Sequence, residues 1–420
     1  MDFTPSPRSA DLTARVRDFI DSRIDPVEAT ILADVQARRD RGENPWTVHP
    51  VIPELQALAR TQGLWNLFLP AGHEGPYAAR FGTDGGVGLS NVDYAPIAEQ
   101  TGRSTLAPLV FNCNAPDTGN MEVLLKYGSQ EQKDTWLEPL LEGRIRSAFL
   151  MTEPDVASSD ATTMAATARI EGDEVVLDGR KWWSTGVGHP DCAVGIFMGV
   201  TDPQAPKHAR HSMVLVPLDA PGVRIERVMP ALGQWDEPLG HGEVSLTGVR
   251  LPASAIIGGP GRAFAIAQGR LGPGRVHHCM RLIGLAERSL ESACERASSR
   301  VAFGKPLANL GGNRERLAEA RIAINQARLH VLHCAWKLDA FGVEGAASEV
   351  SEIKAAVPRM ACQVIDLAIQ LHGGAGVSAD TPLAAAYATA RALRLADGPD
   401  EVHLGVVARY LLRPYQTDQR

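Results

Sequence analysis

The sequence lacks the features expected of a nucleic-acid-binding, secreted or membrane-spanning protein. Its 42 Lys and Arg are outnumbered by 49 Asp and Glu, which gives a formal net charge of −7. A general nucleic-acid binder needs a basic face, so no nucleic-acid partner is expected. The longest apolar stretches, such as residues 192–200, are too short to span a bilayer. No basic segment followed by an apolar run opens the sequence, so we expect a cytoplasmic protein with no membrane span.

Cysteine is scarce, and its spacing excludes the usual cysteine-based sites. The six cysteines are Cys113, Cys192, Cys279, Cys294, Cys334 and Cys362. No two of them form a C-x-x-C pair, which argues against a zinc ribbon or a redox dithiol. Free thiols in a reducing compartment are therefore expected, and no metal site is predicted.

Two common nucleotide-binding signatures are also missing. No G-x-G-x-x-G follows a strand-like segment, and Gly304-Lys305 is followed by Pro306 and lacks the earlier glycine of a P-loop. The neighbouring pair His277-His278 is a poor metal site, because adjacent residues direct their rings to different faces of a helix. We interpret both as ordinary helix residues.

The composition is that of a globular protein, and the periodicity divides it into three parts. Hydrophobic residues make up 44% and charged residues 22% of 420 residues, which excludes disorder and suggests two or three domains. Helical spacing prevails up to about residue 143, a period of two from 146 to 252, and helical spacing again after 258. We predict an N-terminal α-helical domain (1–146), a central antiparallel β barrel or sandwich domain (147–257) and a C-terminal domain resembling a four-helix bundle (258–420), a multidomain α+β protein.

Several local elements can be predicted from these patterns. Glu171-Gly172-Asp173 is typical of the turn of a β-hairpin, and Ser129 is typical of the N-cap of a helix that follows Gly128. One apolar stripe with helical spacing comprises Cys279, Leu282, Ala286, Leu290, Ala293 and Ala297. Long helices are expected over 314–341, 346–372 and 382–412, with a break near Asp397 in the last of them.

Four segments could carry chemistry, and each also has a plain structural interpretation. Residues 151–160 (M-T-E-P-D-V-A-S-S-D) could bind the edge of a ring or phosphate, or could simply form a surface turn. Residues 181–186 (K-W-W-S-T-G) could line the site of a planar cofactor, or could simply border a packed core. Residues 371–377 could allow close approach of a ligand or simply end a helix. In 395–403 (L-A-D-G-P-D-E-V-H), Asp400 and Glu401 are explained as acids of a first helical turn, whereas Asp397 is not.

Taken together and in this order, these motifs resemble the acyl-CoA dehydrogenase flavoprotein family. Residues 151–160 resemble its T-E-P-x-x-x-S-D loop with one extra residue before the serine, and 181–186 its K-x-W-x-T segment. Residues 300–305 (R-V-A-F-G-K) and 370–374 (Q-L-H-G-G) resemble its R-x-x-F-G-x and Q-x-x-G-G segments. The motifs are most similar to those of a subgroup found in animals as the dehydrogenase half of fusions with a kinase-like domain, which is absent from this sequence.

The resemblance implies a cofactor, FAD, and a set of residues that bind it. The implied flavin contacts are Met151, Thr152, Ser159, Trp183, Ser184, Thr185, Pro399 and Glu401, and the implied contacts to the FAD of a neighbouring subunit are Arg300, Phe303, Gln370, Gly373 and Gly374. It further implies that the substrate lies against Ser159, Arg275 and Gly398, and that Asp397 is the catalytic carboxylate.

The reaction implied is α,β-dehydrogenation of a saturated acyl-CoA, of medium to very long chain, to a trans-2-enoyl-CoA in fatty-acid β-oxidation. Asp397 would remove the α-proton while the β-hydrogen leaves as hydride to flavin N5, and hydrogen bonds to the thioester oxygen would stabilise the enolate. Electrons would pass to an electron-transfer flavoprotein, and the enzyme would be a homodimer or homotetramer.

Two departures from the family pattern and several alternatives stay open at this point. Aspartate replaces the more usual glutamate at 397, which leaves Glu401 or a base on another segment as alternatives, and Gly272 stands where the family often has aspartate. The same scaffold could serve an acyl-CoA oxidase or a nitroalkane-oxidase-like flavoenzyme. A non-enzymatic helical binding protein would bind no flavin.

Overall fold

The computed structural model describes residues 3–69, 76–81 and 88–416, and the chain forms two compact units. Unit 1 combines Met1–Ile24, Leu89–Ala107 and Gly272–Arg420, whereas unit 2 combines Asp25–Gly88 and Pro108–Leu271. The two ends of the chain therefore contribute to the same unit. The predicted division at residues 146 and 257 stays a prediction.

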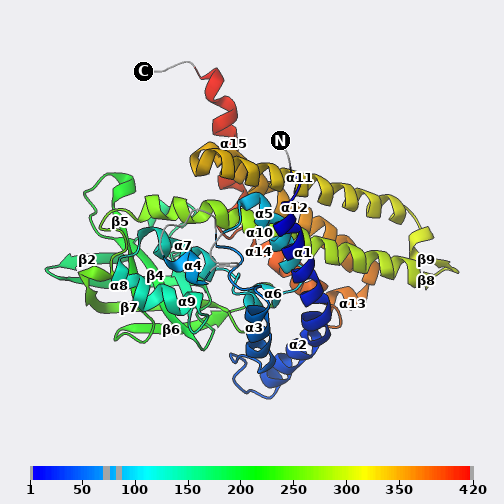
Figure 1. The fold of residues 1–420 in the computed structure, drawn as a ribbon, viewed down its shortest axis with the longest axis horizontal. Coiled ribbons are helices and arrows are strands. Elements are labelled where there is room, and N and C mark those ends of the chain that lie inside the picture. Colours follow the sequence, from blue (N-terminus) through cyan, green and yellow to red (C-terminus); the bar gives the residue numbers. More distant parts are fainter. Residues whose placement is uncertain (1–2, 70–75, 82–87, 417–420) are drawn as a thin grey trace. The chain divides into compact units, whose positions relative to one another are not determined.

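Unit 1 is built almost entirely of helices (Figure 1). Its elements are α1 (Pro7–Phe19), η1 (Ile20–Ile24), α5 (Asn91–Thr101), the later part of α10 (Ala263–Ser299), β8 (Val301–Ala302), β9 (Lys305–Pro306), η7 (Leu307–Asn309), α11 (Asn313–Gly345), α12 (Ala347–His372), α13 (Gly374–Val377), α14 (Leu383–Ala392), α15 (Asp400–Leu412) and η8 (Arg413–Tyr415). The short helix α6 (Ala107–Val110) continues from its first residue into unit 2.

The apolar stripe predicted on α10 is confirmed, because every member is at most 3% exposed. The predicted helix over 382–412 divides into α14 and α15, and the break falls at Asp397 as expected. Helix α15 begins at Asp400, because Pro399 cannot continue a preceding helix but is tolerated at a helix start.

Helices α5 and α10 cross with their backbones in contact, which two glycines make possible. A Cβ added to Gly102 would lie 2.0 Å from the carbonyl oxygen of Arg281, and one added to Gly284 would lie 1.8 Å from that of Glu99. Arg328 on α11 then links both helices, since its guanidinium donates to Glu99 at 2.9 Å and to the α10 residue Glu287. The crossing therefore fixes the part of α10 on which Arg275 and His278 lie.

Unit 2 contains a seven-stranded sheet within the described residues. Its strands are β1 (Arg146–Leu150), β2 (Thr167–Glu171), β3 (Glu174–Thr185), β4 (Cys192–Val200), β5 (His211–Pro217), β6 (Val223–Met229) and β7 (His241–Pro252). They are ordered β1-β4-β2-β3-β7-β6, with β5 paired to β4. Alternating inward residues such as Val175 and Leu177 on β3 and Val244 and Leu246 on β7 form its core.

The sheet is mixed rather than purely antiparallel. The hairpin predicted at Glu171-Gly172-Asp173 is confirmed by the antiparallel pairing of β2 with β3, with Gly172 at φ +67°. Strand β1, however, runs parallel to β4, with Phe149 opposite Ile196. The hairpin and the segment around it form a crossover between β1 and β4, which is long enough to bring them together in parallel.

Helices occupy the remaining part of unit 2. They are α2 (Asp25–Asp40), α3 (Val51–Thr61), α4 (Pro76–Phe81), α7 (Asp117–Tyr127), α8 (Gln130–Gln132), η3 (Lys133–Leu137), α9 (Glu138–Leu141) and the short turns η4 (Ala161–Thr163), η5 (Lys207–Ala209) and η6 (Ala253–Ala255). The predicted N-cap at Ser129 is confirmed, since its hydroxyl accepts from the Gln132 N–H at 3.2 Å and the Gln132 side chain accepts from the Ser129 N–H at 3.1 Å.

Candidate functional site

Asp397 lies in the turn between α14 and α15, in a backbone conformation that side chains other than glycine adopt rarely. Its φ is +57°, and Gly398 follows at φ +103°. Left-handed backbone at a non-glycine residue costs free energy and persists only where surrounding contacts impose it. The side chain of Asp397 is 22% exposed, so the carboxylate is largely but not wholly withdrawn from water.

Donors from three different helices hold this turn, which we call the Asp397 loop (residues 393–399). The carbonyl oxygen of Asp397 accepts from Arg275 Nε of α10 at 3.2 Å and from His403 Nε2 of α15 at 3.1 Å. Lys354 of α12 donates through Nζ to the carbonyl of Leu393 at 2.5 Å and that of Gly398 at 3.4 Å. The loop is therefore fixed from several directions, which explains how the strained residue is maintained.

Burial is the main influence on the pKa values of the titratable groups around the loop. Burial lowers the pKa of His403 to about 4, helped by Arg275, so its ring is neutral and its Nε2 carries the proton that it donates. Burial also lowers the pKa values of Lys354 and Arg275, while the nearby carboxylate of Asp397 opposes both shifts. The loop thus combines a carboxylate with two cationic side chains in a shielded place, which stabilises negative charge.

The carboxylate of Asp397 contacts α10 directly. Its Oδ2 lies 3.3 Å from His278 Nε2, and His278 Nδ1 lies 3.0 Å from Arg281 Nη2. His277 points elsewhere, with its ring 4.7 Å from that of Tyr94, so the two histidines occupy different faces as predicted. Sequence reasoning placed Arg275 here but missed His278, although its position three residues after Arg275 was a usable signal.

Asp400, by contrast, has a structural role. Its Oδ2 accepts from Arg359 at 2.9 Å and from Arg394 at 2.7 Å. Burial alone would raise the pKa of Asp400, but these two guanidiniums hold it below its usual value. Glu401 is exposed in the first turn of α15. Of the three carboxylates in this segment, Asp397 is therefore the candidate for a partly shielded base.

A second set of predicted residues lies in unit 2, where the loop after β1 meets β3. Lys181 is fully buried, and its Nζ donates to Glu153 at 2.8 Å and to the carbonyls of Met151 and Met198 at 2.9 and 2.7 Å. The backbone N–H of Trp182 donates to the carbonyl of Thr152 at 2.9 Å. Hydrogen bonds thus join the segments 151–160 and 181–186, both of which the sequence marked as candidates for the same cofactor.

Glu153 anchors this loop from within. Its carboxylate accepts from the N–H groups of Ala165 and Ala166 at 2.8 and 3.0 Å, besides binding Lys181. Burial lowers the pKa of Lys181 to about 8, and Glu153 opposes that shift. Neither Glu153 nor Lys181 was assigned a role from the sequence. The signal was available, since each is a charged residue within a motif and directly precedes an apolar residue.

The residues after Lys181 provide a surface suited to a planar polar group. Trp183 has φ +52° at an irregularity in the β3–β7 pairing and is 43% exposed, which is unusual for an indole. Trp182 Nε1 and Ser184 Oγ are buried without a hydrogen-bond partner. Thr185 Oγ1 lies 2.9 Å from His241 Nδ1. An exposed aromatic face beside unsatisfied polar atoms fits the ring and polar edge of a flavin.

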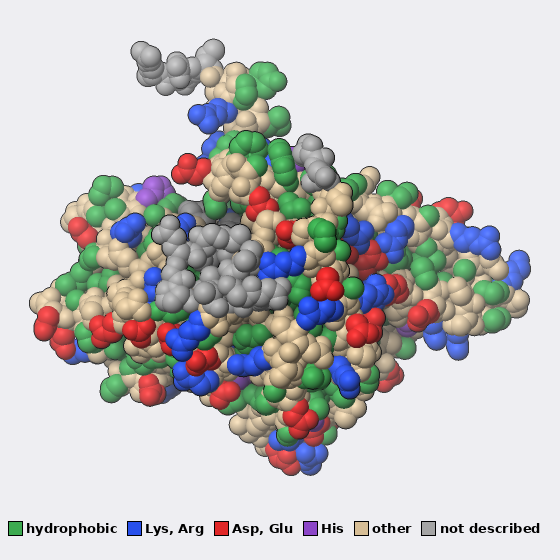
Figure 2. All heavy atoms as spheres, in the orientation of Figure 1, with side chains coloured by type: hydrophobic (Ala, Val, Ile, Leu, Met, Phe, Trp, Pro, Cys, Tyr) green, Lys and Arg blue, Asp and Glu red, His purple; other side chains and the backbone are tan. Residues whose placement is uncertain are grey.

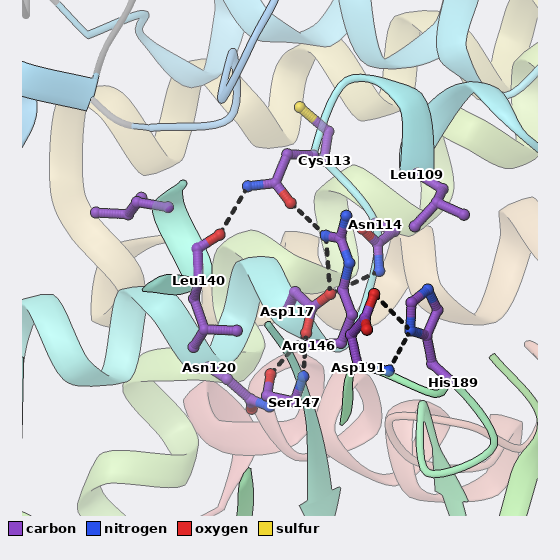
Figure 3. A network of polar contacts seen from close by, with 12 residues as sticks. Leu109, Cys113, Asn114, Asp117, Asn120, Leu140, Arg146, Ser147, His189 and Asp191 are labelled. Atoms are coloured by element: carbon purple, nitrogen blue, oxygen red, sulfur yellow. Dashed lines mark hydrogen bonds and ion pairs between the residues drawn. The ribbon is translucent and has the colours of Figure 1, made fainter. Parts of the chain in front are cut away.

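A buried polar network fixes the start of β1, which leads into this loop (Figure 3). Asp117 accepts from the N–H and hydroxyl of Ser147 at 2.8 and 2.6 Å and lies 3.5 Å from Arg146 Nη1. Asn120 donates to the same hydroxyl at 2.9 Å, and Arg146 also donates to Asn112. Since Met151 follows the last residue of β1, the network sets where the loop begins.

The remaining predicted residues lie on exposed parts of unit 1. Phe303 sits in the β8–β9 hairpin with φ +49° and is 94% exposed, and Arg300 beside it is exposed too. Gln370, Gly373 and Gly374 are exposed at the end of α12, and a Cβ at either glycine would meet nothing within 4 Å. Their contact with the FAD of a neighbouring subunit stays a prediction.

Other candidate chemistries receive no support from the part of the chain that the structure describes. It contains no group of three or more His, Cys, Asp or Glu side chains placed to hold a metal ion. Nor does any described helix combine the length and apolarity needed to cross a membrane. All six cysteines are free, and most are buried. On the face seen in Figure 2, basic and acidic side chains are interspersed.

Comparison with known proteins identifies the family of this chain. Family models for the N-terminal, middle and C-terminal domains of acyl-CoA dehydrogenases match residues 6–144, 148–249 and 261–412. "Acyl-CoA dehydrogenase family member 11" of Gallus gallus is 50% identical over 412 residues, which are 98% of this chain and 51% of that protein. The chain thus spans about half the length of that relative. "Probable acyl-CoA dehydrogenase FadE2" of Mycobacterium tuberculosis is 48% identical, covering 97% of this chain and 96% of that protein.

Solved structures agree with this assignment. A structure from Mycobacterium abscessus assigned to the acyl-CoA dehydrogenases is 65% identical, with a TM-score of 0.94 over 98% of this chain and 100% of that one. The FAD complex of PigA, 24% identical with a TM-score of 0.78 over 98% of this chain and 99% of that one, shares the fold. The chain belongs to the acyl-CoA dehydrogenase family.

Proposed function

We propose that this chain is an FAD-dependent acyl-CoA dehydrogenase in which Asp397 removes the α-proton of a saturated acyl-CoA to give a trans-2-enoyl-CoA. The observation that carries the proposal is the Asp397 loop, where a partly shielded carboxylate lies on a strained turn whose backbone carbonyls accept hydrogen bonds from Arg275, Lys354 and His403. A base fixed on a rigid turn meets the geometric requirement for efficient proton transfer.

FAD is the cofactor, and when bound it would supply the two-electron acceptor for the hydride that leaves the β-carbon. In unit 2, Met151, Thr152 and Ser159 would hold one edge of its ring and Trp183, Ser184 and Thr185 the other side. Support comes from the partly exposed indole of Trp183 and the unpaired hydroxyl of Ser184. By the family resemblance, we assign further FAD contacts to Pro399 and Glu401, and contacts to the FAD of a second subunit to Arg300, Phe303, Gln370, Gly373 and Gly374.

The chain's own residues make the α-proton removable. That proton is weakly acidic, so negative charge on the thioester oxygen has to be stabilised as the proton leaves. We assign this task to the N–H of Asp397, and we assign Gly398 and Ser159 to contacts with the acyl-CoA. The cationic side chains of Arg275 and Lys354 add positive charge beside the loop, since both donate to its carbonyls.

Substrate and electron acceptor follow from the family resemblance. We propose a saturated acyl-CoA of medium to very long chain, an electron-transfer flavoprotein as acceptor, a role in β-oxidation and a homodimer or homotetramer. The exposed Phe303 in the β8–β9 hairpin supports an oligomer, because a large aromatic side chain left in water gains free energy by contact with another surface.

The test is anaerobic mixing of the flavin-loaded protein with saturated acyl-CoAs from butyryl to docosanoyl, followed by flavin absorbance. Bleaching by one chain-length class is expected, and a yellow protein that no acyl-CoA bleaches would overturn the substrate. Asp397→Asn should keep FAD but slow bleaching by about 10²–10⁴-fold, because the base is lost. Asparagine tolerates the φ of +57°, so the variant changes the charge and leaves the turn intact.

A further inference from the structure

The side chains of α10 that approach the Asp397 loop form an ordered series. Arg275, His278 and Arg281 follow one another at intervals of three residues and so share a helix face. Arg275 binds the backbone oxygen of Asp397 at 3.2 Å, His278 approaches its carboxylate at 3.3 Å, and Arg281 approaches the far nitrogen of His278 at 3.0 Å. The histidine thus lies between a guanidinium and the carboxylate.

Hydrogen-bond chemistry decides the protonation of this histidine. A guanidinium has only donors, so Nδ1 of His278 has to accept the hydrogen bond from Arg281 and cannot carry a proton. The neutral ring then carries its proton on Nε2, the atom that faces Oδ2 of Asp397. A second proton on the ring would require the loss of the Arg281 bond and would place two cations in contact.

We propose that His278 is a positioning residue for Asp397: Arg281 holds it as the neutral Nε2–H tautomer, and it donates to Oδ2 so that Oδ1 receives the α-proton. The proposal rests on the function of Asp397 proposed above. The α-C–H bond breaks, its electron pair forms the Cα–Cβ π bond of the enoyl product as the hydride leaves Cβ, its proton forms an O–H bond on Oδ1, and the proton on His278 stays in place. Aspartate is one methylene shorter than glutamate, so its carboxylate reaches less far toward a substrate. A side-chain partner that fixes the rotation of the carboxylate therefore helps to direct Oδ1 at the α-proton.

Several other charged or titratable groups face Asp397 and set the background for a pH test. On α10 these are Arg275 and Cys279, whose thiol pKa burial raises to about 12. On α12 the group is Lys354, and on α15 it is His403, which stays neutral because burial lowers its pKa to about 4. His278 itself lies beside Arg281, and its neighbour His277, on another face of the helix, interacts with it electrostatically. Substitution of His278 leaves all of these in place.

The kinetic test compares His278→Ala with His278→Gln in the flavin-loaded protein, using the panel member that reduces the wild-type flavin fastest. Alanine removes the donor, so the pKa of Asp397 should rise and the acidic limb of the kcat/KM profile should move to higher pH. The rate of flavin reduction should fall at least about tenfold, with acyl-CoA affinity unchanged within about threefold. Glutamine can place an N–H near the position of Nε2, so it should restore the profile and most of the rate.

A second readout separates this proposal from the dehydrogenase proposal itself. Solid-state ¹⁵N NMR of histidine-labelled protein, with His278→Gln used for assignment, should show His278 protonated at Nε2 and not at Nδ1, and Arg281→Leu should remove that preference. A ring protonated at Nδ1, or a His278→Ala variant with an unchanged pH profile and rate, would overturn the positioning role. Failure of every acyl-CoA to reduce the wild type would instead overturn the dehydrogenase, while the tautomer would still be measured.

Discussion

At the residue scale, Gly398 is the position where the Asp397 loop depends most on a missing side chain. Its φ is +103°, and a Cβ there would lie 2.9 Å from His403 Nε2, the atom that donates to the Asp397 carbonyl. Gly398→Ala should therefore displace His403, destabilise the protein by about 1–3 kcal/mol and slow flavin reduction. Thermal unfolding and anaerobic bleaching measure the two effects.

The matched control lies on the adjoining helix. Gly405 is within α15, and a Cβ added there would meet nothing within 4 Å. Gly405→Ala should therefore be neutral or stabilise the protein by about 0.5–1 kcal/mol. A Gly398→Ala protein as stable and active as Gly405→Ala would show that the turn tolerates a side chain and that its geometry is not what holds the base.

Residues also differ in how far the sequence alone could reveal them. Asp397 stood out because it falls at a helix break where the role of a first-turn acid does not explain it, and the structure places its turn among donors from several helices. For His278, the sequence offered its position three residues after Arg275, which places the two on one helix face, but nothing that linked it to Asp397. Its contact with Asp397 joins segments more than a hundred residues apart in sequence, and no local pattern carries that information.

At the element scale, the buried pair Lys181–Glu153 makes the loop after β1 dependent on β3. Lys181→Met would leave the Glu153 carboxylate without its cation, and breaking a buried ion pair on one side costs about 3–5 kcal/mol. We expect faster amide hydrogen exchange over residues 151–166 and weaker retention of FAD. Hydrogen-exchange mass spectrometry and the flavin content after dialysis measure these outcomes.

An exposed pair on the same hairpin serves for comparison. Arg169 and Asp178 lie 3.0 Å apart with side chains 51% and 39% exposed, so Arg169→Met should cost less than about 1 kcal/mol and leave the loop protected. The double variant Lys181→Met with Glu153→Gln should recover part of the loss, because no uncompensated charge remains buried. Equal effects of the two single variants would contradict an anchoring role for Lys181.

Elements with strong local periodicity could be predicted, whereas their pairing could not. The β2–β3 turn and the α10 stripe follow from spacing alone, and both are confirmed. The parallel pairing of β1 with β4 depends on a crossover that no window of sequence displays. The backbone contact of α5 with α10 could not be predicted either. Gly102 and Gly284 lie far apart in sequence, and the need for a glycine at each is visible only where the helices cross.

At the scale of the whole molecule, three buried histidines predict sensitivity to acid. Burial is the main cause that lowers the pKa of His189 and His277 to about 3 and that of His403 to about 4. Unfolded histidine titrates near pH 6.5, so the unfolded chain takes up protons that the folded chain does not. Stability from these groups is complete above about pH 6.5 and is lost as pH falls toward 4, by up to about 4 kcal/mol per pH unit for the three together.

Thermal unfolding from pH 7 to pH 4.5 measures this slope. His277→Gln should flatten it by about 1.4 kcal/mol per pH unit, since one proton fewer is taken up on unfolding. His208, whose side chain is exposed, provides the control, and His208→Gln should leave the slope as it is. An identical slope in both variants would mean that His277 is protonated in the folded protein.

The discontinuity of unit 1 has a consequence for how the chain is made. Helix α1 is hydrogen-bonded to α5, since the Ser6 N–H that precedes α1 donates to Asp93 at 3.0 Å. Helix α5 is in turn bonded to α11, since the Asn91 N–H donates to Asp339 at 2.9 Å. A ribosome adds about 5–20 residues per second, so α1 leaves the exit tunnel tens of seconds before α11. Unit 2 is completed in the interval. Helices α1 and α5 therefore remain without α11 while unit 2 is synthesised, and we expect chaperones to bind nascent chains halted before α10.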